Sequence, residues 1–393
     1  MKLIKYKIKD LGEIVTGNTP STKESRYYNS NDICFIKPAD IGNDITVIDK
    51  TQDYISNEAK NKARVVPEKS LLVVCIGATV GKIAINQNKS SFNQQINAII
   101  TNSKVCRADY LAYALLVNRQ RLIDIANSAV VPIINKTQFS DFQLSIHDDK
   151  KQQEKIVQIL DKSKKLIDKR KEQIEVCDEL IKGLFYDMFG DPTLNPYNYE
   201  VQTLNKVCVK NGEYGSGASA VEYKESMPRY VRITDIQEDG TLNGNKVTLS
   251  IEEDITKYTL TDGDILFART GATVGKTYKY KDSDGHCVFA GYLIRFIPNK
   301  ELINAEYLFR FTKTDAYKLW IQSKQKVVAQ PNINAKQYGE ELTIVVPPLE
   351  LQNKFAEKVQ KIEQQKQLMQ QSLTELENNF NSLMQRAFKG ELF

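Results

Sequence analysis

The six-residue element Gly-Ala-Thr-Val-Gly-Lys occurs twice in the chain, at 77–82 and 271–276. Glycines followed by a lysine could cradle phosphates. The phosphate-binding loop of nucleotide hydrolases, however, needs four residues between its glycines and a Ser or Thr after the lysine. Here three residues separate the glycines, and Ile83 follows the first lysine. The spacing argues against nucleotide hydrolysis. It predicts a tight hairpin between two β-rich runs, with glycines in backbone conformations that other residues avoid.

The cations and hydroxyls of this element are candidates for contact with DNA phosphates or base edges. A second repeated stretch, Phe35–Ile41 and Tyr230–Ile236, carries a cation at the same position in each copy. The plainer interpretation is a structural turn whose glycines let strands pack and whose lysines are solvated. The candidate DNA-binding residues are Lys37, Thr79, Lys82, Arg232, Arg269, Thr270, Thr273 and Lys276.

Residues for catalysis do not form a recognisable pattern. The sequence has no Asn/Asp-Pro-Pro-Tyr/Phe motif for adenine methylation and no Gly-x-Gly-x-x-Gly opening a helix. His147 and His286 are the only histidines, and the six cysteines are scattered without a Cys-x-x-Cys pair. This cysteine usage indicates neither a disulfide framework nor a thiolate zinc site. We therefore predict no catalytic residue and no metal site in this chain.

Two long helices must position these elements. Residues 149–189 carry apolar residues at alternating spacings of four and three with charged residues between them, and the same spacing recurs 199 residues later. A period of 3.5 residues indicates a helix that buries one narrow seam against a partner helix. At 1.5 Å per residue, ~40 residues make a helix ~60 Å long. The residues predicted for the helix–helix seam are Ile156, Leu160, Ile167, Ile174, Ile181, Leu184, Phe355, Val359, Ile362, Leu373, Leu376, Phe380 and Leu383.

The rest of the chain is duplicated in the same order. Asp109-Tyr-Leu is answered by Glu306-Tyr-Leu, and both copies of the glycine element follow the repeated stretch described above. The sequence predicts an α+β fold (mixed α/β), with two similar globular domains joined by an antiparallel intramolecular coiled coil. The predicted boundaries are a first domain at 1–147, a central helix at 148–190, a second domain at 191–346 with a turn-rich linker at 191–200, and a C-terminal helix at 347–393.

The net charge of the chain is compatible with DNA binding but is not evidence for it. The chain has 54 Lys and Arg against 49 Asp and Glu, a net charge of +5, and a pI of about 8.6. This mildly basic balance is compatible with nucleic acid. No run approaches the ~18 apolar residues of a membrane span. We expect a soluble, cytoplasmic protein.

With these features together, the chain resembles the specificity (S) subunit of type I restriction–modification enzymes. The resemblance rests on the duplicated Asp264–Lys276 element and on Ala329-Gln-Pro-Asn-Ile. It also rests on Val346-Pro-Pro-Leu-Glu-Leu-Gln at the start of a long helix, and on the Gly17 and Gly215 loops. The first copy departs from the pattern, since Cys75-Ile76 stands where the second has Arg269-Thr270.

The resemblance implies that the two globular domains are target-recognition domains, each binding half of a split sequence in double-stranded DNA. It implies two methyltransferase (M) subunits that use S-adenosylmethionine, and two restriction (R) subunits that use ATP and Mg²⁺; this chain itself would carry no cofactor. An antiparallel helix pair would relate the domains by a twofold axis and set the half-site spacing. The alternatives are a coiled-coil scaffold with protein-binding domains, or the specificity subunit of a methylation-only or other split restriction system.

Overall fold

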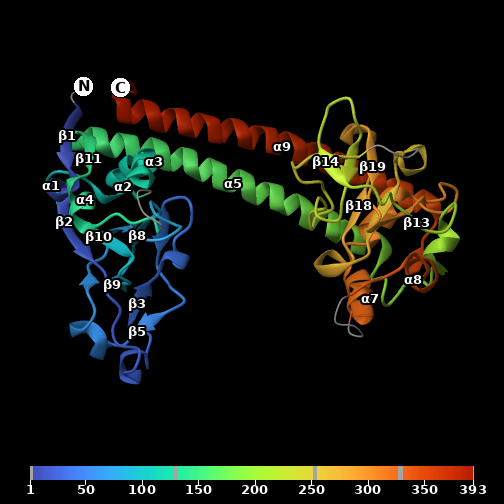
Figure 1. Ribbon diagram of the computed structural model, residues 1–393, viewed down its shortest axis with the longest axis horizontal. Helices are drawn as coiled ribbons and strands as arrows, with labels where there is room; N and C mark the ends of the chain where they lie inside the picture. The colour runs from blue at the N-terminus through green and yellow to red at the C-terminus, as the bar shows by residue number, and fades with distance from the viewer. Residues whose placement is uncertain (1–2, 127–130, 251–254, 326–330, 393) are drawn as a thin grey trace. The chain divides into compact units, whose positions relative to one another are not determined.

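The structure is a computed structural model that describes residues 3–126, 131–250, 255–325 and 331–392. The chain divides into two compact units (Figure 1): unit 1 is Met1–Lys171 with Gln371–Phe393, and unit 2 is Glu172–Gln370. Helices α5 (Lys150–Phe189) and α9 (Leu349–Lys389) both pass from one unit into the other. None of the helices in these ranges is both long and apolar enough to span a membrane.

Unit 1 contains three small sheets. Their strand orders are β1-β11, β2-β10-β7-β8-β4 and β5-β3-β9-β6. The strands are β1 (Leu3–Lys7), β2 (Gly12–Thr16), β3 (Ile33–Ile36), β4 (Thr46–Ile48), β5 (Tyr54–Ile55), β6 (Val65–Val66), β7 (Leu71–Val74), β8 (Ile83–Asn86), β9 (Ser90–Phe92), β10 (Ile96–Thr101) and β11 (Gln143–His147). The helices are α1 (Ile8–Leu11), α2 (Ala108–Val117), α3 (Arg119–Ala126) and α4 (Lys136–Asp141). Helices α2 and α3 are separate, because the Asn118 side chain donates to the Ala114 carbonyl (2.8 Å) and ends α2.

Unit 2 repeats this plan, but its described strands form four separate sheets. Its sheets have the orders β12-β21, β13-β20-β17-β18, β14-β16 and β15-β19. The strands are β12 (Glu200–Thr203), β13 (Glu213–Tyr214), β14 (Ala220–Glu222), β15 (Arg229–Val231), β16 (Val247–Leu249), β17 (Ile265–Ala268), β18 (Thr277–Lys279), β19 (Cys287–Phe289), β20 (Leu293–Phe296) and β21 (Thr343–Val346). The helices are α6 (Ala305–Phe311), α7 (Asp315–Gln325) and α8 (Ala335–Glu341). Ala329 and Gln330, part of one recognised motif, lie outside the described residues.

The central strand of each unit is buried on both faces. Successive side chains of a strand point to opposite faces of the sheet. In β7, Leu71 and Val73 therefore join the core that includes α2 and the long helices, while Leu72 and Val74 join a second core against the other sheet. In β17, Ile265 and Phe267 likewise face the helices, and Leu266 and Ala268 face the opposite core. This explains why both strands read as continuous apolar runs.

The two long helices pack antiparallel, as the sequence predicted. In unit 1 the beginning of α5, with Ile156 and Leu160, shares a core with the end of α9. In unit 2 the end of α5 shares a core with the beginning of α9, where the Phe185 and Phe355 ring centroids lie 5.7 Å apart. Ion pairs follow the same direction, with Lys171–Glu377 in unit 1 (2.8 Å) and Lys366–Asp178 in unit 2 (2.6 Å).

All predicted seam residues are shielded from solvent. Ile156, Leu160, Ile167, Ile181, Phe355 and Val359 are buried, and Ile174, Leu184, Ile362, Leu373, Leu376, Phe380 and Leu383 are half-buried. By contrast Leu166, Val176, Leu180 and Leu368, which lie off the seam, are each more than half exposed. The half-buried class is expected for a two-helix seam, because a single partner covers only one side of each residue.

A buried glutamine fastens each long helix to the domain before it. The Gln153 amide donates to the carbonyls of Val105 (3.1 Å) and His147 (2.8 Å), and its oxygen accepts from the Arg107 N–H (3.1 Å). Gln352 repeats this arrangement, donating to Leu302 and Pro347 and accepting from Asn304. Both side chains are fully buried. Because a buried amide must satisfy its donors and acceptor, the glutamine fixes where each helix leaves its domain.

The predicted domain boundaries near 147, 190 and 346 do not coincide with the boundaries of the two compact units, because each unit includes part of both long helices. The predicted boundaries therefore remain a proposal. Between α5 and β12, residues 190–199 form turns, with Gly190 at φ 73°.

His147 gives the fold a testable pH dependence. Its side chain is buried, with Nδ1 2.7 Å from the Tyr110 hydroxyl, and its Nε2 is buried without a hydrogen-bond partner among the described residues. Burial lowers the pKa of His147 below its ordinary 6.5. The unfolded chain therefore binds more protons near and below pH 6.5, so the free energy of unfolding should fall as pH falls through that range. Denaturant unfolding at a series of pH values should show a smaller decline in His147→Gln. An equal decline in both proteins would contradict this role.

Candidate nucleic-acid interface

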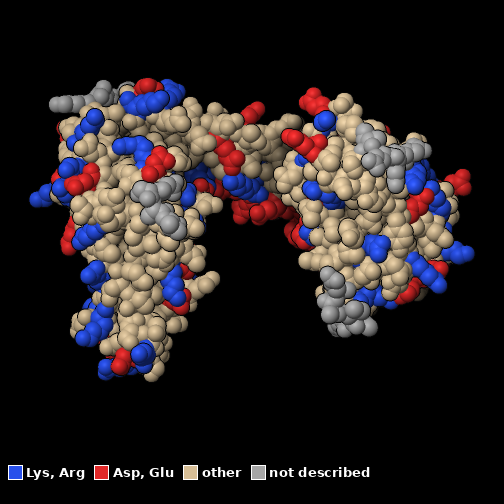
Figure 2. All heavy atoms as spheres, viewed as in Figure 1, with Lys and Arg blue, Asp and Glu red and all other residues tan. Residues whose placement is uncertain are grey.

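Charge alone does not mark a DNA-binding surface. On the face shown in Figure 2, Lys and Arg side chains lie scattered among Asp and Glu over both units rather than forming one broad basic field. Contact with DNA would therefore depend on particular cations, and on the elements that present them.

The repeated glycine element forms a hairpin in both units, as the sequence predicted. It joins β7 to β8 and β17 to β18, which pair antiparallel. Its glycines have positive φ, at 98° and 83° for Gly77 and Gly81 and at 64° and 88° for Gly271 and Gly275. Each hairpin is held by a proline carbonyl, because the Gly77 N–H donates to Pro132 (2.9 Å) and the Gly271 N–H donates to Pro331 (3.1 Å). The glycines therefore have the structural role of the plainer interpretation.

The lysine that ends each hairpin is tethered inside its own domain. Lys82 Nζ donates to the Ile41 carbonyl at 2.7 Å, and Lys276 Nζ lies 3.4 Å from the equivalent Ile236 carbonyl. Lys276 also pairs with Glu238 (2.8 Å). An ammonium has three N–H donors, so these contacts leave room for a phosphate oxygen. They also explain why the lysine accompanies the hairpin in both copies.

Lys37 and Arg232 occupy equivalent backbone positions, but their side chains differ. Both backbone N–H groups donate to the aspartate three residues later. The Arg232 guanidinium binds the carboxylate of that residue, Asp235, through two nitrogens (3.1 and 2.9 Å), whereas Lys37 pairs with Asp53 (2.8 Å) and is 42% exposed. Arg232 is largely committed to a structural ion pair, and Lys37 is the more available of the two.

Thr270 and Thr273 line a small surface hollow, and Arg269 directly precedes Thr270. Arg269 stacks over the Tyr214 ring at 4.8 Å, and its Nε donates to Asn332 (3.3 Å). Thr270, Thr273 and the exposed Tyr292 line a hollow of about 450 Å³. Thr79, the unit 1 equivalent of Thr273, is half-buried in its own hairpin. The structure thus groups three of the candidates in unit 2 and places an aromatic ring beside them.

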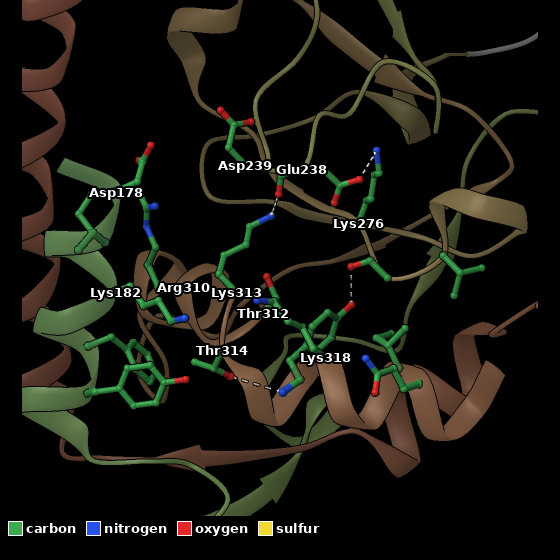
Figure 3. A pocket seen from close by; sticks show the side chains of 18 of the residues that line it. Asp178, Lys182, Glu238, Asp239, Lys276, Arg310, Thr312, Lys313, Thr314 and Lys318 are labelled. Carbon is green, nitrogen blue, oxygen red and sulfur yellow. Dashed lines mark hydrogen bonds and ion pairs between the residues drawn. The ribbon is translucent and has the colours of Figure 1, made fainter. Parts of the chain in front are cut away.

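A larger cavity of about 560 Å³ lies on the other side of the unit 2 hairpin (Figure 3). Lys276 points into it from the hairpin, Arg310 and Lys313 from the end of α6, Lys318 from α7 and Lys182 from α5. Carboxylates of Asp178, Glu179, Glu238 and Asp239 line it as well. The cavity therefore concentrates cations, and most of them are paired.

The two units differ in how the domain is joined to its long helix. In unit 2, Glu306 lies between Lys279 and Arg310 (Nε–Oε1 2.7 Å), and Arg310 continues to Glu363 of α9 (2.6 Å). Burial alone would raise the pKa of Glu306, but the two cations outweigh it and the pKa lies below its ordinary value. Repeat alignment places Ile85, Asp109, Tyr113 and Lys164 at the equivalent positions of unit 1, and all four line an open cavity of about 740 Å³. At these four positions the copies share a scaffold but not the ion pairs.

Side chains suited to nucleophilic or metal chemistry are not assembled. All six cysteines are buried, and burial raises the pKa of Cys75, Cys106 and Cys208 to about 12. A thiol with such a pKa is not a nucleophile at neutral pH. Within the part of the chain that the structure describes, no three His, Cys, Asp or Glu side chains gather as metal ligands.

Comparison with known proteins decides the family. The model of the type I restriction modification DNA specificity domain matches residues 2–176 and again residues 196–378. The chain belongs to this family. The double match agrees with the duplication of hairpin, glutamine and long helix described above.

Curated relatives of this specificity family share modest identity. The specificity subunit of the type I restriction enzyme MjaIX from Methanocaldococcus jannaschii is 28% identical over 204 residues, which cover 51% of this chain and 46% of that protein. The HindI specificity subunit from Haemophilus influenzae is 33% identical over 141 residues, covering 35% and 30%. The chain thus spans less than half the length of these two relatives. The EcoDI specificity subunit from Escherichia coli is 20% identical over 353 residues, covering 79% and 76%.

Solved structures from type I restriction–modification systems have the same fold. The S subunit of a type I restriction–modification system from M. genitalium aligns over 99% of this chain and 96% of its own, with a TM-score of 0.57 and 14% identity. A chain from a structural study of complex assembly and conformational transition of the type I restriction–modification system aligns with a TM-score of 0.62 and 14% identity, covering 99% and 98%.

Sequence reasoning missed several residues that this specificity-family fold brings to the candidate interface. Tyr214 and Tyr292 flank Arg269, and Lys313 and Arg310 enter the larger cavity. Tyr292 directly follows Gly291 before a strand, a pattern that predicts an exposed turn. Lys313 carries no such signal, because its position depends on how α6 and α7 pack against the hairpin.

Proposed function

We propose that this chain is the DNA sequence-specificity subunit of a type I restriction–modification complex. Each globular domain would recognise one half of a bipartite target in double-stranded DNA. The observation that carries the proposal is the repeated scaffold with divergent contacts: both hairpin lysines bind equivalent carbonyls, whereas Arg269-Thr270 of one copy stands where the other has Cys75-Ile76. Two domains that keep a scaffold and vary its surface suit two different half-sites.

The subunit would be non-catalytic, with chemistry supplied by its partners. Two M subunits would use S-adenosylmethionine to methylate the target, and two R subunits would use ATP and Mg²⁺ for cleavage. The helix pair would dock the M subunits and set the spacing of half-sites, since both helices are continuous between the units. No cofactor would bind this chain itself.

The decisive test is the pattern of methylation that the subunit directs. The chain would be co-expressed with an M subunit from its own organism in a host without other adenine methylation, and the genomic DNA would be sequenced for modified bases. The expected result is one bipartite motif with a fixed gap. A protein scaffold would leave no motif, and binding to duplex DNA without steep salt dependence would favour that alternative.

Arg269 and Lys276 should contribute differently to binding. If Arg269 reads a base, Arg269→Ala should weaken binding to the identified target by ~1–3 kcal/mol and relax specificity there. If Lys276 meets a phosphate, Lys276→Ala should weaken binding to all sequences and reduce the salt slope by about one. Fluorescence anisotropy with target and scrambled duplexes measures both.

Lys336 is a matched control, because it is 78% exposed on α8 of the same unit and pairs only distantly with Glu340 (3.9 Å). Lys336→Ala should change neither affinity nor slope appreciably. Wild-type binding in both hairpin variants would leave the unit 2 hairpin with a structural role only.

A further inference from the structure

Lys313 is a cation in the unit 2 cavity whose position the proposed function does not explain. It lies two residues after the end of α6, between the buried Thr312 and Thr314, and its Nζ is 4.9 Å from the Phe309 ring centroid. Among the described residues, its N–H groups donate to main-chain oxygens alone, those of Glu238 (3.3 Å) and Thr277 (3.4 Å). These distances are long for charge-assisted hydrogen bonds, which lie near 2.7–2.9 Å. The hydrogen bonds from the Lys313 ammonium to the protein are therefore weak.

The other cations of the cavity have carboxylate partners. Lys276 pairs with Glu238, and Arg310 pairs with Glu306 and Glu363. Lys318 and Lys182 both approach Asp315, at 3.4 and 3.9 Å. Among the described residues of the cavity, Lys313 is the cation for which the structure gives no carboxylate within ion-pair distance. A cation without a counter-ion in a partly enclosed cavity favours an anionic ligand.

The electrostatic surroundings agree with that geometry. Burial, together with Arg310 and Lys276, lowers the pKa of Lys313 to about 8, against the opposing effect of Asp239 and Glu238. These are the charged groups that face the ammonium, from α6, from the hairpin and from the loop before β16 (Figure 3). A bound anion would add the missing negative charge and raise the pKa of Lys313 again.

The loop before β16 is shaped to approach this lysine. Gly240 has φ 84°, and a Cβ at this position would lie 2.9 Å from Lys313 Nζ and 2.8 Å from the Thr277 carbonyl oxygen. Glycine therefore lets the loop close one wall of the cavity while the ammonium stays in place. Apolar side chains of Ile181 and Ile321 line the cavity too, so a ligand larger than a bare anion would find apolar surface.

We propose that this cavity binds a phosphate group, with Lys313 as its principal cation and Lys276 beside it. The phosphate could belong to the DNA backbone, in which case the inference rests on the proposed function, or to a free nucleotide, in which case it does not. The chemistry is shared: a compact anion meets an ammonium point charge. Lys276, which already pairs with Glu238, would turn toward the same phosphate.

The experiment compares the wild-type chain with Lys313→Met, Lys313→Arg and the control Lys336→Met, whose side chain is 78% exposed on α8 and does not line the cavity. Methionine keeps the length of the side chain without its charge, and thermal melts check that each variant folds. Calorimetric titration with inorganic phosphate and with adenosine monophosphate tests the free ligand. Anisotropy with a random-sequence duplex over a range of salt tests the DNA backbone.

For a DNA phosphate, Lys313→Met should bind the duplex roughly tenfold more weakly at about 0.1 M salt, with the salt slope reduced by about 0.9. For a free nucleotide, calorimetric binding should be lost while duplex binding is unchanged. In either arm wild-type affinity should fall as pH rises through about 8, the pKa of Lys313, and Lys313→Arg should keep its affinity.

Two failures can be told apart. A wild-type complex that directs no DNA methylation and binds no duplex would overturn the proposed function, whatever Lys313 does. A folded Lys313→Met that matches the wild type with the duplex, inorganic phosphate and adenosine monophosphate would overturn the phosphate site alone. That second result would instead favour an acidic side chain of a partner protein as the ligand of Lys313.

Discussion

Insertion of one heptad into each long helix is expected to abolish methylation of the original target and to shift preference to the same half-sites farther apart. The chain passes between the compact units at Lys171–Glu172 in α5 and at Gln370–Gln371 in α9. Heptads placed at these two points leave the contacts inside each unit unchanged and keep the 3.5-residue seam in phase. Seven residues add ~10 Å of helix, which equals the rise of about three base pairs, or roughly a third of a turn of DNA.

The readout is methylation by the co-expressed complex on targets whose spacer grows one base pair at a time. As a control, two residues inserted at each point rotate the following helix by about 200°. This turns the seam away from its partner and should impair folding rather than move the spacing. If a folded, assembled heptad variant still methylates the original spacing, the helices do not determine the gap between half-sites.

Replacement of Phe355 by alanine should destabilise unit 2 by ~3–5 kcal/mol, the range for deleting a buried aromatic side chain. Phe355 is fully buried at the start of α9, and its ring centroid lies 5.7 Å from Phe185 and 5.2 Å from Phe189 of α5. The loss would come from both the removed apolar area and the cavity left between two helices that cannot close on it. This makes Phe355 a direct test of the predicted seam.

Unfolding in denaturant can be followed through the single tryptophan. Trp320 lies in α7 of unit 2 and packs with Tyr317 and Tyr338 at the edge of the same core, so its fluorescence reports on this unit. The matched control is Leu368→Ala in the same helix, since Leu368 is 56% exposed and surface changes usually fall within about 0.5 kcal/mol. Equal effects of the two substitutions would remove Phe355 from the set of residues that hold the helices together.

Repetition made much of this architecture predictable. The two long helices could be predicted because the spacing of their apolar residues is a local property of the sequence. The seam residues that this spacing selects are buried or half-buried. The hairpins could be predicted from the glycine spacing, because Gly77 and Gly271 adopt the positive φ that a tight turn needs and that glycine readily permits. The offset between copies then paired elements that lie about 200 residues apart in sequence.

The roles of individual polar residues could not be predicted in this way. Lys82 and Lys276 were candidates for DNA, and only the folded structure shows each one bound to a carbonyl some 40 residues away. Arg232 was proposed on the same grounds, yet it is held by the buried Asp235.

The sequence by itself thus determined the duplication, the helix pair and the hairpins, since each depends on spacing along the chain. Only the tertiary structure decided which cations remain available to a ligand. A lysine such as Lys313 lacks a carboxylate partner because of where α6, the hairpin and the loop before β16 meet. Contacts between side chains that lie far apart in the sequence depend on how the elements pack, and local sequence patterns do not predict that packing.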